Sequence, residues 1–94
     1  MSNPAIGFAG LGHLGLCSAA AAAEKGFAVA GYDPDARVVE AALSGAPRFH
    51  EPGLGDLIER NRERLALSSG PESLANCDVV FVAHDTPTDE SGLS

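Results

Sequence analysis

The residues best suited to chemistry in this sequence are three glycines, Gly10, Gly12 and Gly15, in a Gly-x-Gly-x-x-Gly pattern. The pattern follows a short apolar run and leads into an alanine-rich segment, an order typical of strand, turn and helix. Gly10 allows a tight turn, and Gly12 lets a pyrophosphate approach the backbone because it has no side chain. Gly15 lets the helix lie close to the sheet. Since a helix start also presents N–H groups to phosphate, the pattern predicts a dinucleotide site.

A carboxylate, Asp33, stands at the end of the next apolar stretch, eighteen positions after Gly15. An acid at that place accepts hydrogen bonds from the ribose hydroxyls of adenosine. A 2′-phosphate would be repelled by its charge, so the sequence favours NAD over NADP. Asp33 also precedes Pro34, where an acid is a good helix N-cap, and the two roles are compatible. The alternative for the whole pattern is a glycine-tolerant turn that binds no ligand.

Three more positions are candidates for contact with the dinucleotide. Arg37 follows Asp33 by one helical turn, so it is expected to lie over the adenine, to pair with Asp33, or to be a solvated charge. His13 lies inside the glycine pattern, where its backbone N–H is the expected contact. Thr86 and Thr88 follow the last apolar run, and strand ends border the ligand crevice of an open α/β sheet. Their hydroxyls are expected to bind the ribose or nicotinamide end, or to cap a local turn.

Other classes of site are disfavoured by composition and spacing. Cys17 and Cys77 stand alone in the sequence and predict two buried thiols in a reducing cytoplasm. His50 and His84 have no partner at metal-ligand spacing, so no metal site is predicted. The net charge of −7 disfavours nucleic acid and anionic membranes as partners. With no long apolar run and no basic secretory n-region, a cytoplasmic location is expected.

The elements that must position these residues alternate between strand and helix. Strands are predicted at Ala5–Ala9, Phe27–Tyr32, Leu65–Ser68 and Asp78–Ala83, and the last is apolar enough to be buried on both faces. Helices are predicted over about His13–Lys25, Pro34–Ser44 and Glu51–Glu63, with a helical turn at Pro71–Asn76.

Two local signals refine the helices. Gly26 is a natural residue to end the first helix, because a left-handed conformation is common there. Asp56 and Arg60 in the third helix are spaced as an i,i+4 ion pair.

The alternation predicts an α/β fold, a Rossmann-type parallel sheet with helices on both faces and strand order 3-2-1-4. A full doubly wound domain has about six strands in two mononucleotide-binding halves. This sequence supplies about four strands, which make one half and the first strand of the other. We therefore expect residues 1–94 to be part of an NAD-binding domain, with central and C-terminal substrate domains absent.

Three segments together resemble the N-terminal region of UDP-glucose/GDP-mannose 6-dehydrogenases, over nearly the whole chain. They are Gly10–Leu16, His50–Leu54, and Asp78–Val82 with the loop Thr86–Gly92. The Glu51–Leu54 run, Glu-Pro-Gly-Leu, is far more specific than the glycine pattern, although its role does not follow from its residues.

The resemblance implies where the cofactor would lie. The three glycines would cradle the pyrophosphate, and His13 and Leu14 would add backbone contacts. Asp33 would hold the adenosine ribose, and Thr86 would lie near the nicotinamide.

The resemblance also implies an activity for the full-length protein. Such enzymes oxidise the C6 alcohol of a UDP- or GDP-sugar to the uronate with two NAD⁺, a step that supplies polysaccharide precursors. A cysteine in a later domain carries the acyl group as a thioester. Neither Cys17 nor Cys77 occupies that place, so no catalytic residue is assigned. This fragment alone is expected to bind NAD(H) and to be inactive, with the nucleotide sugar bound only by the longer protein.

Two other interpretations remain open from the residues. A β-hydroxyacid dehydrogenase-type domain would share the glycine pattern but lacks the Glu-Pro-Gly-Leu insertion. A non-catalytic nucleotide-sensing or interaction module would leave the fourth strand as a sheet edge, through which the chain could associate with itself.

Overall fold

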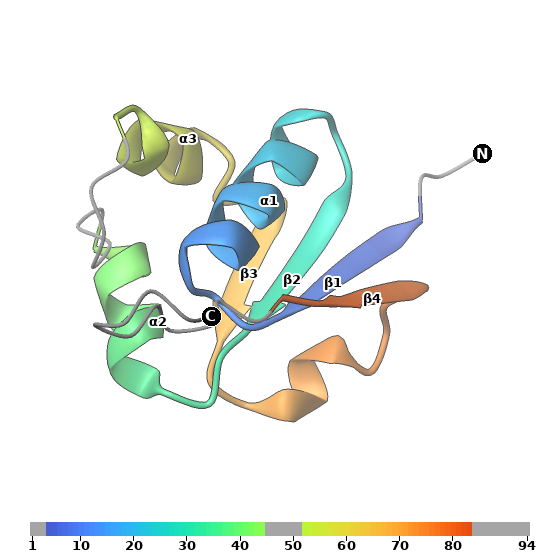
Figure 1. Ribbon diagram of the computed structural model, residues 1–94. Coiled ribbons are helices and arrows are strands. Elements are labelled where there is room, and N and C mark those ends of the chain that lie inside the picture. The colour runs from blue at the N-terminus through green and yellow to red at the C-terminus, as the bar shows by residue number, and fades with distance from the viewer. Residues whose placement is uncertain (1–3, 45–51, 84–94) are drawn as a thin grey trace, which may run out of the picture.

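The computed structural model describes residues 4–44 and 52–83, an open sheet with helices packed against it (Figure 1). The elements in chain order are β1 (Ala5–Ala9), α1 (His13–Glu24), β2 (Ala28–Tyr32), α2 (Ala36–Leu43), α3 (Leu54–Arg60), β3 (Leu65–Ser68), the 3₁₀ turn η1 (Pro71–Leu74) and β4 (Val79–Val82). All strand pairs are parallel, and the order is β3-β2-β1-β4. The predicted Rossmann-type fold and strand order are confirmed.

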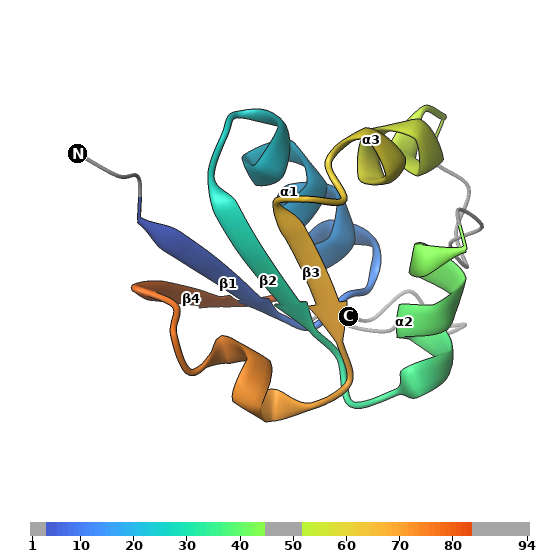
Figure 2. The same ribbon diagram turned by 180° about the vertical axis from the view of Figure 1, so that it is seen from behind.

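The helices α1, α2 and α3 lie on one side of the sheet, and η1 lies on the other. Figure 1 shows α1 in front of the strands, and Figure 2, the view from behind, shows the strands in front of α1. Right-handed crossovers explain this arrangement, because the connections to β2 and β3 run in one direction across the sheet. The connection through η1 runs back to β4 beside β1, so it crosses the opposite face.

The two faces of the sheet differ in the size of their side chains. Alternate residues of a strand point to opposite faces, so the register sorts them into two sets. The face toward α1 carries large side chains, namely Ile6, Phe8, Val29, Leu65, Leu67, Val79 and Phe81. The face toward η1 carries mostly small residues, including Ala5, Gly7, Ala9, Ala28, Ala30 and Ala66. A Cβ at Gly7 would lie 2.9 Å from the Leu74 side chain, because η1 lies so close to that face.

The hydrophobic core lies between α1 and the face with large side chains. From the strands, Phe8 and Val29 are no more than 7% exposed. From α1, Leu16, Ala19 and Ala23 are buried against them. The alanines have no side chain beyond Cβ, so the helix lies close to the strands, and its start is thereby fixed over the end of β1. The helix ends near Gly26 as predicted, and that glycine has φ +105°.

The start of α2 differs from the prediction, which had the helix begin at Pro34 with Asp33 as its cap. The helix begins at Ala36, and Asp35 is the N-cap. Its Oδ1 accepts a hydrogen bond from the Arg37 backbone N–H at 3.0 Å. Asp33 is left outside the helix, because its carboxylate makes other contacts.

The third helix is shorter than predicted, and its ion pair is a different one. The Asn61 Nδ2 donates to the Leu57 carbonyl at 2.8 Å, which ends the helix and turns the chain toward β3. Arg60 forms its ion pair with Glu24 of α1 at 3.1 Å, and the predicted partner Asp56 contributes only a weaker charge interaction that raises the pKa of Arg60. The start predicted at Glu51 lies outside the described residues.

The burial predicted for the fourth strand is wrong. The four β4 residues, Val79, Val80, Phe81 and Val82, are between 42% and 67% exposed. Within residues 4–44 and 52–83, β4 is an edge strand and pairs only with β1. Phe81 stacks on Phe8 with ring centroids 5.5 Å apart, but this contact covers only one side of its ring. An apolar run shows that a strand can be buried, whereas burial also needs a neighbour to cover it.

Candidate functional site

A cavity of about 470 Å³ lies at the carboxyl ends of β1, β2 and β4. It is lined by Ala9, Gly10, Gly12, Tyr32, Asp33, Pro34, Val82 and Ala83. The chain runs from β1 outward to β2 and β3 and then returns to β4 on the other side of β1. The cavity therefore lies where the strand order reverses, which is where open α/β sheets bind ligands.

Gly10 forms the turn out of β1, and its backbone conformation requires glycine. Its φ is +110°, and a Cβ there would lie 2.1 Å from the carbonyl oxygen of Ala83. The Gly10 N–H donates to the Tyr32 carbonyl at 2.7 Å, and the Ala83 N–H donates to the Ala9 carbonyl at 2.9 Å. These bonds hold the ends of β1, β2 and β4 together around the cavity.

Gly15 allows the close approach of α1 to the same turn. A Cβ at Gly15 would lie 1.8 Å from the Gly10 carbonyl oxygen and 3.2 Å from the Ala83 side chain. Gly15 does not line the cavity. Its task in this structure is to let the helix start sit directly over the strand end.

Gly12 is the N-cap of α1 and lines the cavity. No side chain caps this helix, and its first turn holds no acidic residue. The positive end of the twelve-residue helix thus faces the cavity without a protein carboxylate at its own start. This arrangement suits a phosphate, since the N–H groups and the positive dipole end of a helix start attract negative charge.

Asp33 lies at the cavity wall with its carboxylate turned toward the glycine turn. Its Oδ2 accepts a hydrogen bond from the Leu11 N–H, and its Oδ1 accepts one from the Asp35 N–H, both at 2.9 Å. An ionised carboxylate has about four lone-pair sites. Two backbone donors therefore fix the orientation of Asp33 and leave acceptor capacity for ligand hydroxyls.

Arg37 does not pair with Asp33, so that option among the three predictions is wrong. Its guanidinium forms two hydrogen bonds with Asp35, from Nε to Oδ1 and from Nη2 to Oδ2, each 3.2 Å long. The pKa of Arg37 is raised, mainly by these hydrogen bonds and also by the charge of Asp35. The Arg37 side chain is 82% exposed and does not line the cavity.

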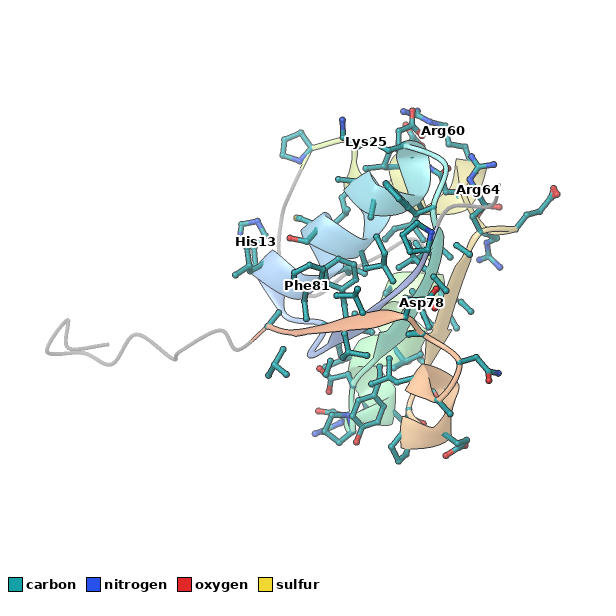
Figure 3. All side chains as sticks on the ribbon, turned by 90° about the vertical axis from the view of Figure 1, so that its right-hand side faces the viewer. His13, Lys25, Arg60, Arg64, Asp78 and Phe81 are labelled. Atoms are coloured by element: carbon teal, nitrogen blue, oxygen red, sulfur yellow. The ribbon has the colours of Figure 1, made fainter. Side chains whose placement is uncertain are left out.

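His13 and Leu14 form the first turn of α1 and are exposed, Leu14 by 59%. Neither lines the cavity. Figure 3 shows His13 at the start of α1, on the side of the helix near Phe81. The candidates Thr86 and Thr88 lie outside the described residues, as do His50 and His84.

Five lining residues were not among the predicted contacts, namely Ala9, Tyr32, Pro34, Val82 and Ala83. They share one property, because each ends a strand or lies within two residues after one. That position could have identified them, since parallel strands place their carboxyl ends at one edge of the sheet.

No described residue is arranged as a nucleophile or a metal ligand. Cys17 and Cys77 are not joined in a disulfide and are only partly buried, so the prediction of two buried thiols is wrong. Burial raises the pKa of the Cys77 thiol, as does the charge of Asp78, and a protonated thiol is a poor nucleophile. Among residues 4–44 and 52–83, no group of three or more His, Cys, Asp or Glu could hold a metal ion. In the same residues no helix has the length and apolar character to cross a membrane.

Comparison with known families gives one clear match. The sequence profile of the UDP-glucose/GDP-mannose dehydrogenase family, NAD binding domain, matches residues 4–94. The UDP-glucose 6-dehydrogenase AglM of Haloferax volcanii is 34% identical over 84 residues, which cover 88% of this chain and 20% of that protein. The UDP-glucose 6-dehydrogenase TuaD of Bacillus subtilis is 32% identical over 90 residues, 93% of this chain and 20% of that protein.

Solved structures agree with these sequence matches. A UDP-glucose dehydrogenase from Pyrobaculum islandicum superposes with a TM-score of 0.81 at 32% identity, covering 93% of this chain and 21% of that one. A ternary complex of GDP-mannose dehydrogenase from Pseudomonas aeruginosa gives a TM-score of 0.79 at 28% identity, with the same coverage. The chain spans about one fifth of the length of these relatives.

Proposed function

Because the chain belongs to the UDP-glucose/GDP-mannose dehydrogenase family through its NAD-binding domain, we propose that it is the cofactor-binding part of a nucleotide-sugar 6-dehydrogenase. The observation that carries the proposal is the cavity at the strand reversal, lined by Gly10, Gly12 and Asp33. These three residues supply a side-chain-free surface and, close beside it, a carboxylate. A dinucleotide needs both, one for its pyrophosphate and one for its ribose.

The pyrophosphate lies against the glycine turn in this proposal. Gly10 and Gly15 are needed for the turn itself, since a Cβ on either would overlap a backbone carbonyl. Gly12 leaves the phosphate oxygens free to reach the start of α1, where His13 and Leu14 contribute backbone N–H groups. The helix dipole adds a favourable interaction of about 0.3–1 kcal/mol with the negative charge.

Asp33 binds the adenosine ribose in this proposal. The Leu11 and Asp35 N–H groups already orient its carboxylate, so it need not reorganise when the ribose hydroxyls arrive. A 2′-phosphate at the same place would bring two negative charges together, so NAD is favoured over NADP. The last predicted contact, from Thr86 to the nicotinamide end, is part of the same proposal.

The whole reaction requires more protein than this chain supplies. Oxidation of the C6 alcohol to a carboxylate removes two hydrides in succession, and the bound cofactor accepts one hydride at a time. The substrate pocket and the cysteine that carries the acyl group are assigned to the rest of the longer protein. We therefore propose that the 94-residue chain binds NAD(H) in the cytoplasm without oxidising a nucleotide sugar by itself.

Calorimetric titration of the chain with NADH and with NADPH tests the proposal. NADH is expected to bind at least about tenfold more tightly, the value of one hydrogen bond to a charged group. In a parallel assay with NAD⁺ and UDP-glucose or GDP-mannose, the chain is expected to form no NADH. A preference for NADPH would contradict the role of Asp33, and turnover by this chain alone would contradict its assignment as a cofactor-binding part.

The exposed β4 edge favours a second, additional property, which is association with a partner. Four consecutive apolar residues, Val79–Val82, are exposed on a strand whose outer backbone groups have no neighbouring strand in the described residues. Such edges pair readily with other strands. We propose that the isolated chain associates with itself here, and light scattering at rising concentration is expected to show oligomers. A monomer at every concentration would exclude this property.

A further inference from the structure

Cofactor choice in this fold depends on which charges lie near the adenosine ribose, and two acidic residues follow the end of β2, where the ribose is proposed to bind. Asp33 lines the cavity, and Asp35 follows it two residues later as the cap of α2. The Asp35 N–H donates to Asp33 Oδ1 at 2.9 Å, so the two residues are held in a fixed relation. Asp35 in turn holds the Arg37 guanidinium through two hydrogen bonds.

Arg37 is distinguished by its position among the basic residues that the structure describes. Lys25 follows the end of α1, Arg60 ends α3 and pairs there with Glu24 of α1, and Arg62 and Arg64 lie between α3 and β3. Figure 3 shows Lys25, Arg60 and Arg64 gathered at one end of the molecule, away from His13 at the start of α1. Among the described lysines and arginines, Arg37 alone lies next to the carboxyl end of β2.

We propose that Asp35 is a second determinant of cofactor choice, because it engages the one described arginine that could serve a 2′-phosphate. This inference rests on the proposed function, since it concerns the ribose end of the same site. An arginine near the acid at the end of the second strand is what accommodates a 2′-phosphate in this fold. Here that arginine is already paired with a carboxylate of the protein.

Asp35 acts against a 2′-phosphate in two ways. It accepts the two parallel hydrogen bonds that the Arg37 guanidinium would otherwise donate to a phosphate. It also adds a second negative charge beside Asp33. Since Arg37 is largely exposed, the ion pair itself adds little to stability. Its effect is therefore expected in the cofactor preference, with little change in folding.

The test measures the ratio of the dissociation constants for NADPH and NADH in a set of variants of the chain. Asp33→Asn removes the direct repulsion and is expected to lower the ratio about tenfold. Adding Asp35→Asn keeps a good N-cap residue but removes the charge that holds Arg37. The double variant is expected to lower the ratio by a further factor of about five to ten, mainly through tighter NADPH binding.

Two controls separate this mechanism from a general loss of negative charge. Glu40→Gln removes the same unit of charge from α2 without touching the Asp35 pair, and it is expected to leave the ratio unchanged. In an Arg37→Gln background, most of the further gain from Asp35→Asn is expected to disappear, and only the part that comes from the lost charge of Asp35 is expected to remain. If Asp35→Asn changes nothing, or changes the ratio equally without Arg37, the inference is wrong. Wild-type protein that fails to bind NADH would instead overturn the proposed function.

Discussion

The two ends of the parallel sheet are built by different means. At the carboxyl end, the structure depends on residues without side chains, since a Cβ at Gly10 or Gly15 would overlap a carbonyl oxygen. At the amino end, it depends on side-chain hydrogen bonds among Glu24, Asn61 and Arg64. Asn61 is 1% exposed, donates to Glu24 Oε1 at 2.8 Å, and accepts from Arg64 Nη2 at 2.9 Å.

Helix α1 connects these two ends and explains why they differ. Its positive end faces the cavity with no acidic residue in the first turn. Arg64 caps the negative end of α1, because its Nε donates to the Ala23 carbonyl at 3.0 Å. A side chain thus caps the negative end of α1, and in the proposed function the positive end faces the pyrophosphate. Both ends are thus expected to contribute to stability, whereas only the carboxyl end is expected to contribute to binding.

The largest effect on the free energy of unfolding is expected from Gly10→Ala, and Gly26→Ala is its matched control. Both glycines have positive φ, +110° and +105°, but a Cβ at Gly26 meets nothing within 4 Å. Gly26→Ala is expected to cost about 1–2 kcal/mol, the strain of a left-handed alanine. Gly10→Ala adds the overlap with Ala83 and is expected to cost about 3–5 kcal/mol. Urea unfolding followed by circular dichroism measures both.

NADH binding separates the same two variants further. Gly26→Ala is expected to bind NADH as the wild type does under conditions where it is folded, whereas Gly10→Ala is expected to lose binding. Equal losses of stability and of binding in the two variants would show that the conformation, and not the packing against Ala83, sets the requirement at Gly10.

A smaller effect on the free energy of unfolding is expected from Asn61→Ala, which removes the side-chain hydrogen bonds at the amino end of the sheet. The change leaves the Leu57 carbonyl and the Arg64 guanidinium without a bond that each now makes. The lost bond to the carbonyl of the half-buried Leu57 costs about 1–3 kcal/mol, so the free energy of unfolding is expected to fall by about that amount. Asn76→Ala, at an exposed position, is the matched control and is expected to change it by less than about 0.5 kcal/mol. The dissociation constant for NADH is expected to stay the same in both, and weaker binding by Asn61→Ala would contradict the division between the two ends.

The smallest effect is expected in the pH dependence of stability at Glu24. Its hydrogen bond from Arg60 lowers the pKa below the ordinary value of 4.5, and the bond from Asn61 adds to the shift. A carboxylate with a depressed folded-state pKa stabilises the protein above the unfolded value and loses this contribution as the pH falls through the folded value. The difference in melting temperature between wild type and Glu24→Gln is therefore expected at neutral pH and to vanish well below pH 4.5.

Removing Arg60 checks the cause of that pH dependence. In an Arg60→Gln background, the difference in melting temperature between the protein with Glu24 and the Glu24→Gln variant is expected to shrink at neutral pH. A difference that persists unchanged in acid would show that the shape of the side chain, and not its charge, matters at this position.

The fold was largely predictable because its signals are local and repeated. Two strands, Ala5–Ala9 and Leu65–Ser68, have the predicted bounds, and the alternation of elements gave the correct strand order. The exposure of β4 was not predictable, since it depends on what covers the strand. The pair between Arg60 and Glu24 was also missed, because its partners are 36 residues apart in the chain.

The candidate site was predictable where residue type alone decides geometry. Gly10, Gly12 and Asp33 line one cavity, as their spacing indicates. The cap of α2 was misassigned because an acid stands on each side of Pro34, and tertiary contacts decide which one caps. The family match to residues 4–94 favours the nucleotide-sugar dehydrogenase interpretation over the β-hydroxyacid alternative.

The most direct test of the account is an amide NMR titration of the chain labelled with ¹⁵N, with NAD⁺ as the ligand. The account predicts the largest shifts at the carboxyl end, at the amides of Gly10, Gly12 and Asp33. It predicts little change at Asn61 and Arg64, which lie at the amino end. Shifts centred on Asn61 and Arg64, or no shifts at Gly10 and Gly12 when the ligand is saturating, would contradict the claim that the carboxyl end is the binding end.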